Sequence, residues 1–131
     1  MKTVEFYKDI ESTATGESYV KEDGCRIWVI PEKQWHREDG PAFINAHGTQ
    51  EWWINNTRHR LDGPARISSY GCWWYKQHRL DRLNGPAHCY VDAITGEYNE
   101  YYWLNNTEIS ETEYWNNPEV IKHKLKKIIE L

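Results

Sequence analysis

The sequence predicts a mainly β fold. Stacked antiparallel β-hairpins form one elongated, twisted sheet, and an amphipathic α-helix caps its C-terminal end. Three observations support this prediction. The tripeptide Gly-Pro-Ala recurs at residues 40–42, 63–65 and 85–87, with spacings of 23 and 22 residues. Aromatic doublets recur at a similar period, and an apolar pattern of helical spacing ends the chain. A phrase repeated at a fixed period is typical of a repeat array, in which each unit buries its face against its neighbours.

Length and composition indicate a single domain with a thin, aromatic-rich core. The chain has 131 residues, among them eight Trp and nine Tyr. Each aromatic side chain buries about 150–250 Å², so a few rings replace many aliphatic residues. Within the one domain, residues 1–23 are expected to form an N-terminal cap, residues 24–109 the hairpin repeats and residues 110–131 a C-terminal helical cap.

Each repeat unit is predicted to be a hairpin, as in "EWWINNTRHRLDGPA" at residues 51–65. An aromatic strand leads into Asn-Asn, which favours a tight turn, and a His-Arg strand returns. Asp-Gly-Pro ends that strand, because Gly tolerates unusual dihedrals and Pro offers no N–H. The alignment places aromatic pairs at 52–53, 73–74 and 102–103, and His-Arg pairs at 36–37, 59–60 and 78–79. The first copy of the phrase has diverged from the others, and in it Trp28 occupies the position that Trp52 occupies in the next copy.

The C-terminal residues carry helix signals. Ser110 and Glu113 have the spacing of a capping box. Asn117-Pro118-Glu119 provides an N-cap, a proline at the first helical position and an acid in the first turn. Apolar residues then recur at helical spacing: Val120, Ile121, Leu125, Ile128 and Ile129. They predict an amphipathic helix of about 14 residues that caps the sheet or lies across one face.

The paired tryptophans predict two different faces, because successive strand residues point to opposite sides of a sheet. The alignment places Trp52, Trp73 and Tyr102 on an apolar core face. It places Trp53, Trp74 and Trp103 in a column on the other face, with Phe43, Arg66 and His88 on the same side. Three such rings present about 450–750 Å². A patch of that size is either covered by another segment or used for binding.

The recurrence of the polar residues argues against an active site. An active site is one asymmetric constellation, and zinc needs three or four converging ligands. The six His instead recur about once per hairpin, so we expect Asp or backbone partners for them. The sequence has none of the common nucleophile, phosphate-loop or metalloprotease motifs. The sequence therefore predicts a protein that is not an enzyme and holds no metal or cofactor.

Net charge and targeting signals limit the binding partners and the cellular compartment that we expect. Sixteen Lys and Arg stand against 20 Asp and Glu, a net charge of −4. An acidic chain disfavours direct binding to nucleic acid or to anionic lipid. The three Cys form no CxxC, and the sequence shows neither a signal peptide nor an apolar run of membrane-spanning length. These features predict a cytoplasmic protein that does not engage a membrane.

The repeated phrase "W-[IL]-N-N-T-x-H-R-x-D-G-P-A" resembles MORN-type repeats, in the variant form found in bacterial and phage proteins. The resemblance covers roughly residues 24–108. It implies a non-enzymatic β scaffold that binds another macromolecule. Small acidic members of this kind look like phage-encoded accessory proteins. The resemblance therefore implies an inhibitor of a host defence enzyme, acting in the host cytoplasm by surface occlusion.

The sequence thus predicts a protein-binding module whose partner has a basic surface. Trp, Tyr and Arg dominate interface hot spots, and acidic residues at the rim steer a basic partner. The predicted partner-binding residues are Trp53, Trp74, Trp103, Arg60, Arg66, Arg79 and His88. A homodimer through edge strands is a further expectation. The alternative is a small-ligand protein that binds a nucleotide or carbohydrate on the same Trp and Arg face.

Overall fold

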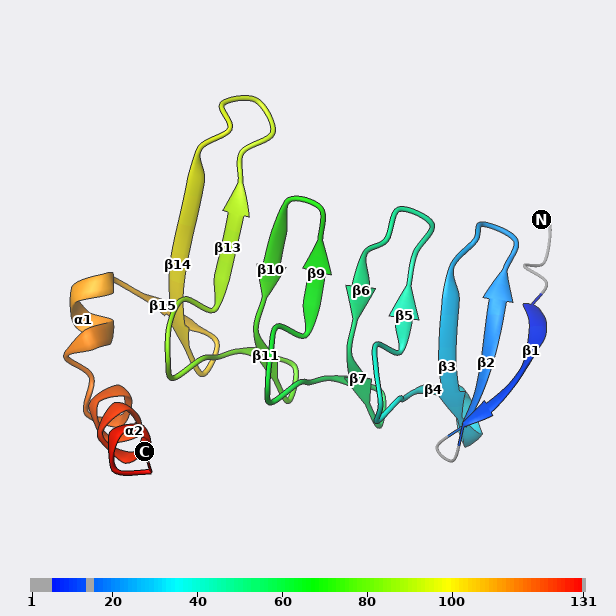
Figure 1. Cartoon of the computed structure of the whole chain (residues 1–131), viewed down its shortest axis with the longest axis horizontal. Coiled ribbons are helices and arrows are strands. Elements are labelled where there is room, and N and C mark those ends of the chain that lie inside the picture. Colours follow the sequence, from blue (N-terminus) through cyan, green and yellow to red (C-terminus); the bar gives the residue numbers. More distant parts are fainter. Residues whose placement is uncertain (1–5, 14–15, 131) are drawn as a thin grey trace.

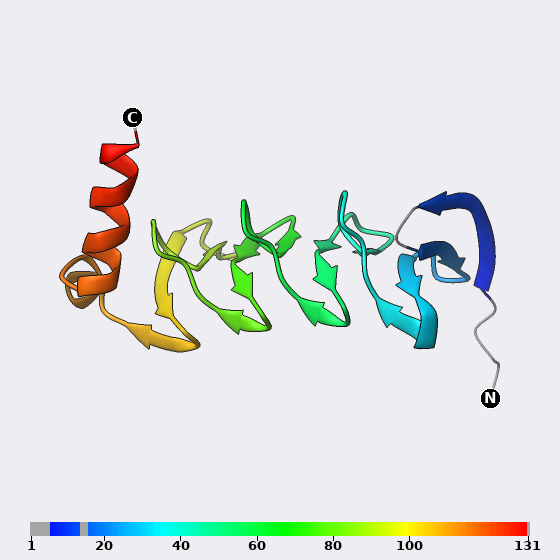
Figure 2. The ribbon, with the colours of Figure 1, turned by 90° about the horizontal axis from the view of Figure 1, so that it is seen from below.

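The chain forms an elongated row of antiparallel β-hairpins with two helices at its C-terminal end (Figure 1). A computed structural model describes residues 6–13 and 16–130. Seen along a perpendicular direction, the hairpins still follow one another in chain order (Figure 2). The prediction of a mainly antiparallel β fold with a C-terminal helix is confirmed.

The main sheet has the order β1-β2-β3-β5-β6-β9-β10-β13-β14-β15, with β4 paired to β3. Its strands are β1 (Phe6–Thr13), β2 (Gly16–Lys21), β3 (Arg26–Ile30), β4 (Gln34–Trp35), β5 (Phe43–Ile44), β6 (Gln50–Glu51), β9 (Arg66–Ser68), β10 (Gly71–Trp73), β13 (His88–Val91), β14 (Tyr98–Leu104) and β15 (Thr107–Ile109). Two short hairpins form separate sheets: β7 (Trp53–Ile54) with β8 (Thr57–Arg58), and β11 (Tyr75–Lys76) with β12 (Arg79–Leu80). A 3₁₀ turn spans Pro31–Lys33. The expected pairing of an edge strand with a second copy remains a prediction.

The β7–β8, β11–β12 and β14–β15 hairpins each turn through two residues that both have positive φ. Asn55 and Asn56 have φ of 47° and 62°, and Asn105 and Asn106 have φ of 49° and 69°. This is the geometry of a type I′ turn, whose twist matches that of the flanking strands. The predicted Asn-Asn turns are confirmed. The pair 77–78 makes the same turn, with φ of 50° and 69°.

Each of these turns is docked onto the preceding unit by hydrogen bonds. The Asn55 N–H donates to His36 Nδ1 at 2.8 Å, and the Asn56 N–H donates to the Trp35 carbonyl at 2.8 Å. One unit later the Gln77 N–H donates to His59 Nδ1 at 2.8 Å. The expectation that these His hold backbone partners is confirmed for His36 and His59. They are acceptors that join consecutive units.

The prediction that His78-Arg79 is the third His-Arg pair is wrong. The position of His36 and His59 is taken by Asp81, whose Oδ1 accepts the Asn105 N–H at 2.8 Å. His36, His59 and Asp81 each lie four residues before the Gly of Gly-Pro-Ala. His78 lies in the turn that precedes β12 and accepts the Arg58 N–H at 3.2 Å.

The core is a column of rings along one face of the array. Backbone N–H groups of Trp28, Trp52 and Trp74 donate to the alanine carbonyls of the three Gly-Pro-Ala segments, at 2.8, 2.8 and 2.7 Å. These alanines are fully buried: Ala42, Ala65 and Ala87. The prediction that Trp74 lies on the outer face with Trp53 is therefore wrong. Register is set by the bond to alanine, and it places Trp74 in the core column and Trp73 on the other face.

The two helices close the C-terminal end of the row. Helix α1 (Glu111–Trp115) begins at Ser110, whose Oγ accepts the Glu113 N–H at 3.2 Å. Helix α2 (Pro118–Ile129) begins at Asn117, whose Oδ1 accepts the Glu119 N–H at 2.9 Å. Both predicted caps are confirmed. The helices lie beyond β14 and β15 and do not extend across either face of the sheet (Figures 1 and 2).

Helix α2 packs through its first turn. Val120 is buried in a cluster with Tyr102 and Tyr114. The rest of the predicted apolar stripe is exposed, with exposed fractions of 42% at Ile121, 55% at Leu125, 57% at Ile128 and 83% at Ile129. The described helices are too short or too polar to span a membrane.

Candidate functional site

The seven predicted site residues do not form one surface. Trp53, Trp103, Arg66 and His88 belong to the face opposite the core column. Trp74 and Arg60 belong to the core-column face, and Arg79 lies at the hairpin edge, where its Nη1 donates to Asn105 Oδ1 at 2.9 Å. The two faces have different chemistry and are described in turn.

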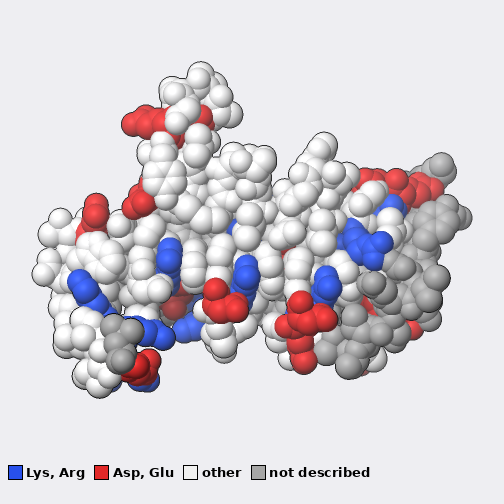
Figure 3. Space-filling view, in the orientation of Figure 1, with Lys and Arg blue, Asp and Glu red and all other residues white. Residues whose placement is uncertain are grey.

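On the core-column face, one arginine stacks on each tryptophan. The guanidinium carbons of Arg37, Arg60 and Arg82 each lie 3.9 Å from a ring centroid, over Trp28, Trp52 and Trp74 respectively. Figure 3 shows Lys and Arg side chains spaced along the array, some of them beside acidic side chains. Such cation–π contacts are worth about 0.5–2 kcal/mol each.

Each stacked arginine is also held by two hydrogen bonds. Arg60 Nε donates to Asp62 Oδ1 at 3.2 Å, and its Nη1 donates to the Pro64 carbonyl at 3.1 Å. Arg37 makes the same bonds to Asp39 and Pro41. The ring contact and two of the donors of Arg60 are therefore engaged within the chain.

On the opposite face, one row of side chains crosses the sheet. Its members are paired directly across neighbouring strands, and directly opposed residues share a face. This cross-strand row consists of Phe43, Glu51, Arg66, Trp73, His88 and Tyr101. Further rings contact its members: Trp35, Trp53, Tyr70 and Tyr90.

The aromatic part of the row is stacked. The rings of Trp73 and His88 lie 4.8 Å apart at an interplanar angle of 17°, and His88 lies 5.5 Å from Tyr101. Tyr90 is stacked on Tyr101 at 6.2 Å. At the other end, Trp35 stacks on Phe43 at 5.2 Å. Stacked and edge-to-face rings stabilise each other, so the row is fixed before any partner arrives.

A charged cluster separates the two aromatic ends of the row. Glu51 Oε1 lies 3.1 Å from Arg58 Nε, and Glu51 Oε2 lies 3.9 Å from Arg66 Nε. Trp53 Nε1 also donates to Glu51 Oε1 at 3.3 Å. The guanidinium of Arg66 lies 4.5 Å from the Trp73 ring. One carboxylate is therefore shared by two guanidinium groups, and the cluster keeps a net positive charge.

His88 lies in the row as an uncharged ring. Burial lowers its pKa, and Arg66 lowers it further, although Glu108 acts in the opposite direction. Among the described residues, His88 Nε2 and Trp103 Nε1 are buried nitrogens that have no hydrogen-bond partner. Buried polar groups are normally paired, so these two nitrogens are exceptions.

The thiols and carboxylates of the described residues form no metal-binding group. Within residues 6–13 and 16–130, no group of three or more His, Cys, Asp or Glu is placed to hold a metal ion. Cys72 lies opposite Cys89 in the sheet, and both are free thiols. Burial, followed by the interaction with Cys89, raises the pKa of Cys72 to about 11. A thiol that stays protonated at neutral pH is a weak nucleophile.

Comparison with known proteins gives no relative. No family model matches the chain, and neither the curated proteins nor the solved structures contain a match. The resemblance to MORN-type repeats remains a prediction.

Sequence reasoning placed Phe43, Arg66 and His88 on this face and missed the other half of the row. Glu51, Trp73 and Tyr101 each stand directly before a core-column residue, so they point to the opposite face. Counting back from Gly-Pro-Ala reveals this, because Trp52 and Trp74 both lie 13 residues before the alanine. Alignment on the aromatic doublets instead shifted the third unit by one residue.

Proposed function

We propose that the protein is a non-enzymatic binding module that holds a partner protein against the cross-strand row. One observation carries the proposal. The row carries stacked aromatic side chains on either side of a charged cluster, on a sheet face over which no described helix lies. Trp, Tyr and Arg in such surroundings are the residues that dominate interface hot spots.

The β13–β14 hairpin extends this surface. It reaches beyond the other hairpins (Figure 1) and carries at its tip the apolar side chain of Ile94, which is 96% exposed. Val91 and Tyr98 are paired with each other on the face opposite Tyr90 and Tyr101. Apolar side chains at such a tip are suited to insert into a partner. The hairpin begins next to Tyr90 and Tyr101, so one partner can contact both.

Charge on the hairpin favours a basic partner. Asp92, Glu97 and Glu100 lie on it, and the whole chain has a net charge of −4. Acidic groups beside an aromatic contact surface steer a partner of opposite charge and accelerate association at low salt. Occlusion of a functional surface on that partner would make the protein an inhibitor.

The test uses two matched variants of the full chain. The row variant is Tyr70→Ala/Trp73→Ala/Tyr101→Ala, and the control variant is Leu61→Ala/Ile121→Ala, which removes exposed apolar side chains outside the row. Both are checked for folding by circular dichroism. Each protein is used to capture partners from cell extract, and the captured protein is then purified and titrated against all three by calorimetry.

The proposal expects one protein bound near stoichiometry by wild type and control, with binding lost from the folded row variant. Its affinity is expected to fall as salt rises. Equal affinity of the row variant would show that the row is not the contact surface. Absence of any retained protein would overturn the protein-binding function itself.

A further inference from the structure

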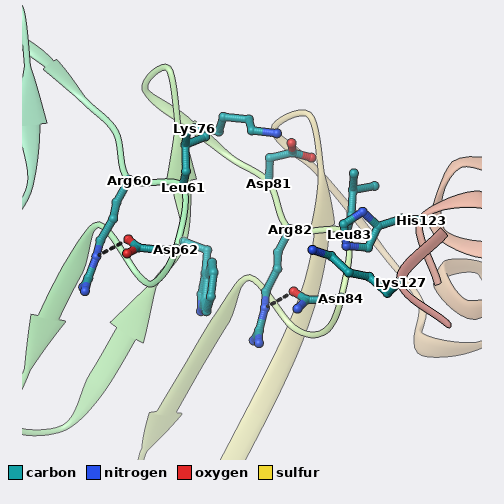
Figure 4. Close-up of a pocket in the computed structure, with 11 residues that line it drawn as sticks. Arg60, Leu61, Asp62, Lys76, Asp81, Arg82, Leu83, Asn84, His123 and Lys127 are labelled. Atoms are coloured by element: carbon teal, nitrogen blue, oxygen red, sulfur yellow. Dashed lines mark hydrogen bonds and ion pairs between the residues drawn. The ribbon is translucent and has the colours of Figure 1, made fainter. Parts of the chain in front are cut away.

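Two grooves on the core-column face occupy equivalent positions in successive units. The first lies beside Trp52, between the Arg37 and Arg60 segments, and the second lies beside Trp74, between the Arg60 and Arg82 segments. The second is also lined by His123 and Lys127 of α2 (Figure 4). Since matching segments of successive units line the two grooves, differences between the grooves come from the side chains at matching positions.

The grooves differ in the sign of their charge. The first is lined by two arginines and three carboxylates, those of Glu38, Asp39 and Asp62. The second is lined by four cationic side chains and two carboxylates. Its cationic side chains are those of Arg60, Lys76, Arg82 and Lys127. The first groove therefore repels an anion, whereas the second attracts one.

Four replacements and the helix separate the two grooves, and one of them, Asp81 in place of His59, opposes the change of charge. Leu61 stands where the first groove has Glu38, and Asn84 stands where it has Asp62. Lys76 stands where it has Ile54. His123 and Lys127, four residues apart on one face of α2, reach toward Leu83 and Asn84 (Figure 4).

Arg82 differs from the other stacked arginines. Its Nε donates to the amide oxygen of Asn84 at 3.0 Å, whereas Arg37 and Arg60 donate to carboxylates. It keeps the ring contact with Trp74 and the bond to the Pro86 carbonyl. The guanidinium is therefore rigidly placed, and no carboxylate of the described residues is paired with it.

The second groove has the size of a small-ligand site. Its volume is about 340 Å³, and its walls combine the cations with Trp74, Leu61 and Leu83. Ligand pockets of this size commonly combine apolar walls with a few placed polar groups. Guanidinium and ammonium groups together suit phosphate oxygens, since arginine presents a planar fork and lysine a compact charge.

We propose that the groove between Arg60 and α2 binds a small phosphate-bearing molecule. The phosphate lies between Arg82 and Lys127, and the organic part lies against Trp74 and the leucines. Lys76 extends away from the Arg82 guanidinium, at the other end of the groove (Figure 4). This site is on the opposite face from the cross-strand row and does not depend on the function proposed for that row.

The test is calorimetric titration of the full chain with inorganic phosphate, a nucleoside monophosphate and glycerol phosphate. Comparison of the three probes distinguishes a site for free phosphate from one that also holds the organic part. Asn84→Asp introduces the aspartate that the other units have at this position, as Asp39 and Asp62. Its carboxylate neutralises Arg82 and leaves the backbone around the groove unchanged. Lys127→Ala removes a lining charge, and Lys122→Ala removes the same charge from an exposed position of α2.

We expect at least one probe to bind wild type and Lys122→Ala equally. Its affinity falls about tenfold or more in Asn84→Asp and in Lys127→Ala, as loss of a charge-assisted contact requires. Two results overturn the proposal: no binding of any probe up to about 10 mM, or unchanged affinity in folded Asn84→Asp. The row variant is expected to bind phosphate like wild type.

Discussion

Arg82 lies over the ring of Trp74, with its guanidinium carbon 3.9 Å from the ring centroid. The same arginine donates to the carbonyl of Pro86, which precedes the buried Ala87. Trp74 in turn donates its backbone N–H to that alanine. Ring, arginine and Gly-Pro-Ala segment therefore hold one another, and the same contacts recur around Trp28 and Trp52.

Removal of Arg60 tests this arrangement. We expect Arg60→Ala to lower the free energy of unfolding by about 2 kcal/mol, because it removes a cation–π contact and a charged donor to a backbone carbonyl. Arg60→Lys should recover only a minor part, since an ammonium cannot stack and bond Asp62 and Pro64 together. Urea unfolding followed by circular dichroism measures both. Equal stability of wild type and Arg60→Ala would show that the stack contributes nothing.

The glycine of Gly-Pro-Ala is required for contact with the arginine. A Cβ on Gly63 would lie 2.8 Å from Arg60 Cζ, closer than real Cβ contacts allow. We expect Gly63→Ala to cost about 1–3 kcal/mol by displacing the guanidinium from the ring. In the Arg60→Ala background the same substitution should cost clearly less. A double-mutant cycle in urea measures this coupling, and additive effects would contradict the steric explanation.

Local signals in the sequence were sufficient for two of the tight turns and for the helix caps. Asn55-Asn56 and Asn105-Asn106 fixed two turns through their tolerance of positive φ. Ser110 and Asn117 fixed the helix starts through their side-chain oxygens. These features depend on residues within a few positions of each other, so a single sequence reveals them.

The face of each side chain was less predictable, because it depends on register between strands. The loop between β5 and β6 is longer than the loop between β9 and β10. That difference moves Trp73 out of line with Trp52 and brings it opposite Arg66 and His88. The packing of α2 could not be predicted either. The apolar stripe indicates a helix, but it does not show which residue of the helix contacts the sheet. Here Val120 does so, and Leu125 remains exposed.

Tyr114 joins the helical cap to the last Gly-Pro-Ala segment. Its hydroxyl accepts the Gly85 N–H at 3.1 Å and donates to the Arg82 carbonyl, and its side chain is fully buried. We expect Tyr114→Phe to cost about 1–3 kcal/mol, because two buried backbone groups lose their partner. Thermal and urea unfolding measure the loss. Tyr70→Phe, at an exposed ring, is the control and should change stability by less than about 0.5 kcal/mol. A Tyr114→Phe variant as stable as this control would show that the hydroxyl does not hold the cap.

His59 is expected to make stability depend on pH. Burial lowers its pKa, and Lys76 lowers it further, so the folded protein binds the proton less readily than the unfolded chain. Its contribution is therefore complete above the ordinary pKa of about 6.5 and is lost as the pH falls below it, toward the lowered folded value. Protonation of Nδ1 also removes the acceptor of the Gln77 N–H.

His59→Asp isolates this contribution, because Asp81 already performs the same task one unit later. An aspartate does not titrate between pH 5 and 7 and should keep accepting the Gln77 N–H. We expect the loss of unfolding free energy between pH 7 and pH 5 to be smaller in His59→Asp than in wild type. Some loss should persist, since burial lowers the pKa of His88 in the same direction. Urea unfolding at the two pH values gives the difference, and an identical loss in both proteins would show that His59 does not couple stability to pH.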